Sequence, residues 1–403
     1  MLLNLKILVM LITVFCLRPS AFGQQFTTYG LIFAFVALFI NYIEMNISVK
    51  ATKKTIIIPK LHIYLIISLT LLWSYLMIHG VFVDSNGQEF TVKALYSNLI
   101  IGFIFVVLLS DLKSNYLFFK TLIIIIILMC LSFCITFILS KFVGGIDNLK
   151  IISLNIEGYN NSGSIFFPFT QIYGVLNFGD VQLFRAQGFF RESGIFQAFI
   201  IWALFNLKYF KLNNWYNKLL LIIGLVSTFS TIGIAICFII WSLRLFMYKN
   251  KILAIAILSL GLYSALYAPY IGVISKAETH GASIDDRSNA TTRGLENLSE
   301  NIVGTGLYNQ DEFYIENGNI NLLAMSYTLG LLGLLLVLLM YFLPLIVFKS
   351  NEDKKKYLLS ILPFFLTLLF SQPILDAPFI FIMLLANLNY KSLKNGGENE
   401  NII

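Results

Sequence analysis

The sequence has little charge for its length, and this excludes most soluble folds. Only 12% of the 403 residues are charged, whereas soluble domains carry about 25%. Hydrophobic residues make up 58% of the chain, and the mean hydropathy is +0.81. One soluble core could not bury so much apolar surface, but a bilayer accepts helices that are apolar all round. The composition therefore indicates an integral membrane protein with little that could form a separate soluble domain.

Cysteine and histidine are also scarce, with four and three residues respectively. All four cysteines lie inside apolar runs, and Cys130 and Cys134 share a predicted helix face without a histidine nearby. A zinc site or a disulfide framework is therefore not expected. The net charge of +7 fits cytoplasmic lysines better than nucleic-acid binding.

The hydropathy pattern predicts an all-α membrane protein with about twelve transmembrane helices. Eight apolar runs approach the length of one span: 2–17, 29–48, 61–80, 94–110, 119–140, 193–207, 252–271 and 321–348. Residues 219–246 and 357–389 are each too long for one span of about 20 residues and short for two. Polar segments at 227–231 and 371–378 interrupt them. Each is therefore predicted to form a tight hairpin of short helices.

Lysine placement predicts the orientation. With the N-terminus inside, cytoplasmic segments hold 18 of the 22 lysines, counting Lys6, as the positive-inside rule expects. Reading either hairpin as a single span would place the next lysine cluster outside. The first apolar run is also compatible with a signal peptide ending near residues 21–23, and it is taken here as a helix.

The predicted organisation alternates helical blocks with two long outer segments. Neither outer segment is long or apolar enough for a conventional domain. The blocks are N-terminal transmembrane helices (1–140), a first periplasmic loop (141–192), central helices (193–271), a second periplasmic loop (272–320), C-terminal helices (321–390) and a disordered cytoplasmic tail (391–403).

Arginine is distributed in the opposite way to lysine. Four of the six arginines lie in the two outer loops, as two pairs with a spacing of six: Arg185 and Arg191, then Arg287 and Arg293. Topology gives no reason for arginine on this side, but its guanidinium binds phosphate and carboxylate bidentately. The pairs therefore predict an anionic ligand, such as a lipid phosphate or pyrophosphate. The alternative is a set of loop salt bridges with the acidic residues nearby.

Residues 185–194, RAQGFFRESG, place charge, glycine and aromatics directly before a predicted helix. Glu192 or Ser193 can cap that helix, whose N-terminal amides also favour an anion. The aromatic residues fit either an interfacial belt or a wall that stacks on sugars.

This stretch resembles the Arg-x-x-Gly-x-Phe motif of the O-antigen polymerase and ligase superfamily. Further segments resemble that family in order and spacing over roughly residues 180–345. They are the Ser/Thr-rich STFSTI at 227–232, Asp286 and Arg287, Arg293 followed by the G-x-G turn of 301–306, Asn319 to Leu323, and Gly330 to Gly333. The N-terminal half agrees only in hydropathy.

The resemblance implies a membrane-embedded, GT-C-like glycosyltransferase of the bacterial inner membrane, working at the periplasmic face without metal or cofactor. Its substrates would be undecaprenyl-pyrophosphate-linked oligosaccharides. A polymerase transfers the growing glycan from its lipid pyrophosphate to the next lipid-linked unit, whereas a ligase transfers it to lipid A core. A chain-length regulator protein is a candidate partner.

Charge grows on the pyrophosphate leaving group, and preorganised arginines stabilise it. A carboxylate can act as base for the acceptor hydroxyl, with Glu312 as a further candidate. The predicted catalytic residues are Arg185, Arg191, Arg287, Glu192 and Asp286. The predicted substrate-binding residues are Arg293, Gly188, Phe190, Gly304, Gly306, Asn319 and Asn321.

Two departures from the family pattern matter. Ligases carry a histidine where this chain has Asn319 and Asn321, while His280 comes about 40 residues earlier; this favours a polymerase over a ligase. The arginine of the family's SRG-like core is absent, since Ile232 and Gly233 stand there. A flippase would show cations inside its spans and a secondary transporter two related halves; the nearly charge-free spans and the lack of a repeat argue against both.

Overall fold

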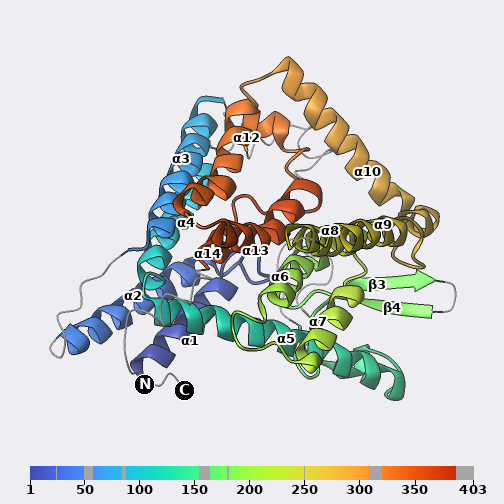
Figure 1. Ribbon diagram of the computed structural model, residues 1–403. Helices are drawn as coiled ribbons and strands as arrows, with labels where there is room; N and C mark the ends of the chain where they lie inside the picture. The colour runs from blue at the N-terminus through green and yellow to red at the C-terminus, as the bar shows by residue number, and fades with distance from the viewer. Residues whose placement is uncertain are drawn as a thin grey trace.

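The computed structural model describes residues 1–23, 25–49, 58–83, 88–153, 164–178, 181–248, 250–307 and 320–386. These residues are mainly helical, and Figure 1 shows their arrangement. The N-terminal helices are α1 (Leu2–Phe15), α2 (Thr27–Val49), α3 (Lys60–Val83), α4 (Gln88–Leu108) and α5 (Leu112–Phe142). The central helices are α6 (Ser193–Asn206), α7 (Trp215–Ser227), α8 (Thr231–Met247) and α9 (Lys251–Tyr267). The C-terminal part holds α10 (Val273–Glu300), α12 (Ser326–Phe342), η2 (Leu343–Val347), α13 (Asn351–Phe370) and α14 (Pro378–Leu384).

The structure is mainly helical and includes apolar helices of membrane-spanning length, as the prediction of a helical membrane protein requires. Among the described residues, four helices are long and apolar enough to cross a bilayer: Thr27–Ile47, Lys60–Val83, Leu112–Phe142 and Ser326–Val347. Six more are apolar but only 10–17 residues long. Many large apolar side chains point outward, such as Phe39 on α2 and Ile255 on α9, as lipid contact requires. With 31 residues, α5 is about 46 Å long and exceeds a hydrocarbon core of about 30 Å.

The two predicted helix breaks are present, but the packing around them differs from the prediction. The helices α7 and α8 are separated at residues 228–230, where Phe229 has a φ of 48° and the Ser230 hydroxyl accepts a hydrogen bond from the Gly233 amide. The second break lies between α13 and α14. In each case the two helices touch only over a short stretch: α7 lies mainly on α5 and α6, α8 lies mainly on α9 and α13, and α14 contacts α4 more than α13. The expectation of tight hairpins is therefore wrong.

The last predicted span is shorter than expected. Helix α14 has seven residues, all of them buried, and is only about 10 Å long. A helix of this length does not cross a bilayer. As far as the chain is described, α14 is a buried core helix against α4 and α13.

The two segments predicted to be outer loops, 141–192 and 272–320, contain regular structure that hydropathy does not reveal. In the described part of 141–192, a short 3-10 turn, η1 (Asp147–Leu149), is followed by two antiparallel hairpins. They are β1 (Lys150–Ser153) with β2 (Ser164–Phe166), and β3 (Ile172–Phe178) with β4 (Val181–Ala186). The fold is therefore not strictly all-α outside its apolar helices.

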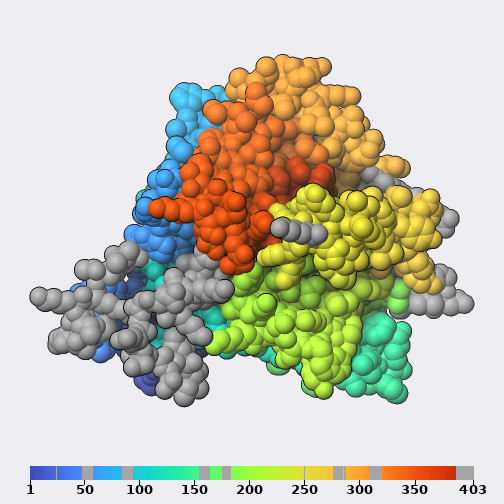
Figure 2. Space-filling model, viewed as in Figure 1, coloured from blue at the N-terminus to red at the C-terminus, as the bar shows by residue number. Residues whose placement is uncertain are grey.

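The second predicted loop contains a helix of 28 residues, α10. It packs on α9 and α12, burying Ala290, and the Ser326 hydroxyl donates to the Gly294 carbonyl at 2.7 Å. Figure 2 shows α10 as an exposed edge of the molecule. A polar helix and a polar loop have the same hydropathy, so the sequence pattern did not separate them.

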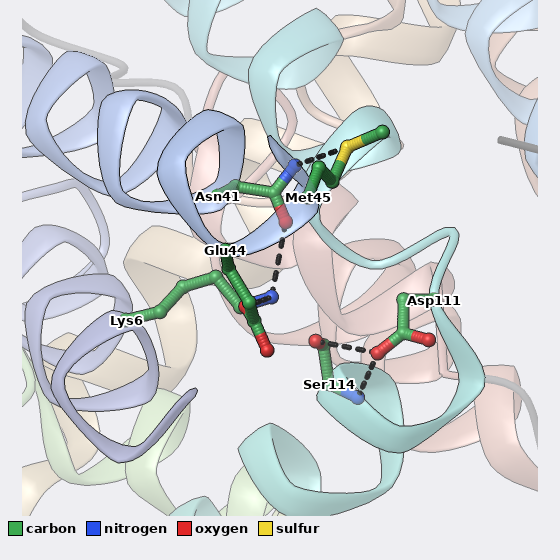
Figure 3. A network of polar contacts seen from close by, with 6 residues as sticks. All are labelled: Lys6, Asn41, Glu44, Met45, Asp111 and Ser114. Atoms are coloured by element: carbon green, nitrogen blue, oxygen red, sulfur yellow. Dashed lines mark hydrogen bonds and ion pairs between the residues drawn. The ribbon is translucent and has the colours of Figure 1, made fainter. Parts of the chain in front are cut away.

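Lys6 is buried where α1 meets α2. Its Nζ lies 2.6 Å from Glu44 Oε2 and donates to Asn41 Oδ1 at 3.0 Å, so the cluster joins α1 to α2 (Figure 3). Close by, Asp111 caps α5 by accepting hydrogen bonds from the amide and hydroxyl of Ser114. The apolar helices are therefore not free of charge in their interior.

Candidate functional site

The segment 185–194 forms the end of β4 and the turn into α6, and it is fastened to the chain that follows α1. The Ala21 amide donates to the Phe189 carbonyl at 2.9 Å, and the Arg191 amide donates to the Pro19 carbonyl at 3.0 Å. Gly188 has a φ of +58°, and a Cβ there would lie 2.9 Å from the Phe196 ring. The turn therefore requires glycine at this position, because of its positive φ and the lack of room for a side chain.

Phe190 belongs to the core and not to a sugar-stacking wall. Its side chain is fully buried. Its ring stacks on Phe199 with centroids 4.2 Å apart and on Phe379 with centroids 6.0 Å apart. Because no face of the ring is open, its predicted role in substrate binding is not supported by this structure. Its packing joins α6 to α14.

Arg185 lies beside the N-terminus of α6 and connects four elements: its own strand β4, the strand β3, the helix α6 and the α7–α8 turn. Its Nη2 donates to the Ser193 hydroxyl at 2.7 Å, and its Nε donates to the Thr228 carbonyl at 3.2 Å. The guanidinium also lies over the Tyr173 ring, 4.9 Å from its centroid, in a favourable cation–π position. Because the half-buried guanidinium is held on several sides, its orientation is fixed before any ligand binds.

Arg287 of α10 reaches the same place from the second outer segment. Burial is the main effect that lowers the pKa of Arg185; Tyr173 raises that pKa, and the charge of Arg287 lowers it again. Arg287 also lowers the pKa of Tyr173, which burial and Glu192 raise. The charge of Arg287 therefore acts on the Arg185 guanidinium, although about 100 residues separate the two along the chain.

Tyr173 is the centre of this cluster, and no sequence pattern pointed to it. Among the described charges, those of Glu192, Arg185, Arg287 and Arg191 act on its hydroxyl. Three positive groups and one carboxylate leave an excess of positive charge in a half-buried place. Like charges repel strongly when partly desolvated, so this arrangement favours an anion that pairs with the arginines.

Arg293 does not join the cluster. Six residues correspond to about 1.7 helical turns, so Arg293 lies on another face of α10 and its side chain is exposed. Arg287 instead shares a face with Ala290 and Gly294, which pack on α12. The predicted second pair is therefore divided.

The glycines of the G-x-G turn pack against α12. Gly304 and Gly306 have φ values of +90° and +98°, and a Cβ on Gly304 would lie 2.5 Å from the Gly330 amide nitrogen. The Thr305 and Gly306 amides donate to the Tyr327 and Thr328 carbonyls, both at 3.0 Å. The turn is thus bound to the first turn of α12 through its backbone, and its amides are occupied within the protein.

The remaining predicted residues have structural roles or lie outside the described part. Asn321 is buried; its Oδ1 accepts from the Ala324 amide at 2.8 Å and its Nδ2 donates to Thr291 at 3.3 Å, which ties α10 to the start of α12. Asn319 and Glu312 lie outside the described residues, as does the side chain of Asp286, whose backbone belongs to α10. Within the described residues, no group of His, Cys, Asp and Glu is arranged to hold a metal ion.

A cleft beside the arginine cluster is lined by Arg18 and Asp376, which the sequence analysis did not predict as site residues. It lies between the chain after α1, the turn before α6 and the α13–α14 turn, and its enclosed volume of about 10 Å³ has room for about one water molecule. Arg18 and Asp376 form an ion pair there, with Nη1 and Oδ2 2.8 Å apart. Arg191 and Glu192 also line it. Arg18 is the first arginine of the chain, and its position after an apolar run was the only available signal.

The fold and the site together define a helical membrane protein with an arginine-rich site where several helix ends meet. No protein-family model, curated protein or solved structure matches the chain.

Proposed function

We propose that the protein is a glycosyltransferase that polymerises undecaprenyl-pyrophosphate-linked repeat units into O-antigen or a related surface polysaccharide. The observation that carries the proposal is the meeting of Arg185 and Arg287 beside Tyr173. Two segments far apart in the sequence contribute positive charge to one half-buried place. A lipid pyrophosphate is an anion of the charge and shape that such a pair binds.

The chemistry follows from this charge. The acceptor hydroxyl oxygen bonds to the anomeric carbon of the growing glycan while the bond from that carbon to the phosphate oxygen breaks. The pyrophosphate leaves with the electron pair, and the hydroxyl proton passes to a base, for which Glu192 is the candidate beside the cluster. Arginines held in place before the reaction stabilise the leaving group more than the ground state.

The proposed topology has twelve spans in the bacterial inner membrane, with the N-terminus inside and the site facing the periplasm. The structure supports the proposal in one respect. The end of α1, the start of α6, the α7–α8 turn and the α13–α14 turn are all predicted to face outward, and they lie together around the segment 185–194.

The proposal is tested by lipopolysaccharide gels of a strain that lacks the gene and carries wild-type or variant copies. Wild-type should restore a ladder, whereas Arg185→Ala and Arg287→Ala should leave core plus a single repeat unit at normal protein levels in the membrane. Arg244→Ala is the matched control, since this arginine lies at the other end of α8 beside Phe205, and it should keep the ladder.

Other outcomes would identify other functions. Bare core with polymer retained on the lipid carrier would indicate a ligase, and repeat units trapped at the cytoplasmic face would indicate a flippase. A full ladder in the strain that lacks the gene would contradict a role in O-antigen synthesis. A full ladder with both the Arg185→Ala and the Arg287→Ala variants would contradict the assignment of these arginines to the site.

A further inference from the structure

We propose that the turn at residues 166–170, which joins β2 to β3, inserts into the lipid leaflet at the C-terminal end of α5 and anchors the segment 141–192 to the bilayer. The turn has the sequence Phe-Phe-Pro-Phe-Thr. It leads directly into β3, which carries Tyr173. The inference rests on α5 as a membrane-crossing helix and is independent of the reaction that the protein catalyses.

This turn is fastened to the side of α5 by hydroxyl groups. The Phe169 amide donates to the Ser132 hydroxyl at 3.1 Å, and the Thr136 hydroxyl donates to the Phe167 carbonyl at 2.7 Å. The Thr170 side chain is buried, with its Oγ1 2.7 Å from Ser132 Oγ and 2.8 Å from Thr136 Oγ1. The position of the turn along the axis of α5 is therefore fixed by Ser132 and Thr136.

These two hydroxyl residues lie well inside the apolar part of α5. The twenty residues between Lys120 and Lys141 contain no charged residue, and they extend over about 30 Å, which matches the hydrocarbon core of a bilayer. Ser132 and Thr136 precede Lys141 by nine and five residues, which corresponds to about 14 and 8 Å along the helix. The turn therefore lies beside the part of α5 that acyl chains surround, below the leaflet surface that Lys141 marks.

The backbone of the turn is suited to lipid, which offers no hydrogen-bond partner to a free amide. All four of its backbone N–H groups donate within the protein over 2.8–3.1 Å: Phe166 to Thr170, Phe167 to Leu149, Phe169 to Ser132, and Thr170 to Phe166. The remaining residue, Pro168, has no N–H group. Non-helical backbone can therefore enter the leaflet here without leaving an amide unbonded.

The side chains of the turn point in the directions that lipid requires. Phe167 is 49% exposed and Phe169 is 69% exposed, although the backbone that carries them is held on α5. Leu131 and Ile138 of α5 are exposed as well, so the two rings extend a surface that already faces lipid. Lys150, which pairs with Phe166 in the β1–β2 hairpin, is exposed and can extend its ammonium group to lipid phosphates. An apolar surface that continues the lipid-facing side of a span fits acyl chains as its partner.

The test places a tryptophan on the turn of the full-length protein, reconstituted in phosphatidylcholine vesicles with plain or brominated acyl chains. Bromine quenches a tryptophan only where it contacts the acyl chains. The fluorescence of the four native tryptophans is measured on wild-type protein and subtracted. The fluorescence added by Phe169→Trp, and separately by Phe167→Trp, should be strongly quenched in brominated vesicles. Ser299→Trp is the control, because Ser299 is an exposed residue of the polar helix α10, and its added fluorescence should be unchanged.

Two outcomes would overturn the proposal. Quenching of both added tryptophans by aqueous iodide, without quenching by bromine, would show that the turn faces water. Quenching by neither reagent would show that protein, such as a second copy of the chain, covers the turn. Each substitution replaces one exposed aromatic side chain by another, so the variants should keep the helix content and melting temperature of wild-type. Failure of the polymerase proposal is recognised separately, as a full ladder in the strain that lacks the gene, with the quenching by brominated lipid still present.

Discussion

The ion pair between Lys6 and Glu44 allows a sharp prediction about the stability of the helix bundle. The Lys6 side chain is 2% exposed and that of Glu44 is 30% exposed. Removing one partner of a buried pair costs about 3–5 kcal/mol, because the other charge stays buried without compensation. The two single variants should therefore differ, since Lys6 is far more buried than Glu44.

The magnitudes follow from these positions. Lys6 lies four residues inside α1, about 6 Å from its first residue, so its ammonium can partly reach water by snorkelling. We expect Glu44→Leu to lower the free energy of unfolding by about 3 kcal/mol. Lys6→Met leaves a half-exposed carboxylate and should cost about 1 kcal/mol. The double variant replaces the pair by apolar side chains and should lie within about 1 kcal/mol of wild-type.

The assay is unfolding of the purified protein by sodium dodecyl sulfate in mixed micelles, followed by circular dichroism. Glu352→Ala is the control, because Glu352 is 62% exposed and its i,i+4 partner Lys356, 3.7 Å away, keeps Asp353 at 3.4 Å as a second partner. The loss should be at most about 0.5 kcal/mol. Equal losses in the two single variants that simply add in the double variant would refute the reasoning, because they would show that the two charges do not act on each other.

Four further predictions follow from the site. Arg185→Lys keeps the charge but loses the planar fork that bonds Ser193 and Thr228, so the rate of polymer formation in vitro should fall about 10²–10³-fold; a wild-type rate would refute the preorganised fork. Phe190→Leu should lower stability by about 1–2 kcal/mol with normal activity per folded molecule, as core packing requires, and an activity loss at unchanged melting temperature would instead favour sugar stacking. Gly304→Ala should lower the melting temperature strongly, because a Cβ would lie 2.5 Å from a backbone nitrogen at a φ of +90°, and a normal melting temperature would contradict the packing described. Burial raises the pKa of Tyr173 above its ordinary value of 10.0, so its contribution to stability is present below that pH and lost as the pH rises through the raised value; melting curves should show a smaller alkaline loss for Tyr173→Phe than for wild-type.

The local patterns of the sequence predicted the helices and several of their ends. The apolar runs correspond to α1–α6, α9 and α12, and the polar interruption at 227–231 contains the turn between α7 and α8. These features depend on short-range properties, namely the transfer of side chains from water to lipid and the capping of helix ends. The arginines of the two predicted outer loops were noticed for the same reason, because the positive-inside rule made them unexpected there.

Tertiary structure decided which of these residues meet. Arg287 reaches Arg185 only because the polar segment after α9 is a long helix, and neither hydropathy nor spacing distinguishes such a helix from a loop. The burial of Phe190 and Lys6 and the pairing of Arg18 with Asp376 depend on contacts between helices that are distant in the chain. The sequence by itself determined that the chain enters a membrane and where its helices break, because each of these depends on neighbouring residues alone. The site was decided by packing, since Arg287 acts on Arg185, and Arg18 pairs with Asp376, only after the helices have come together.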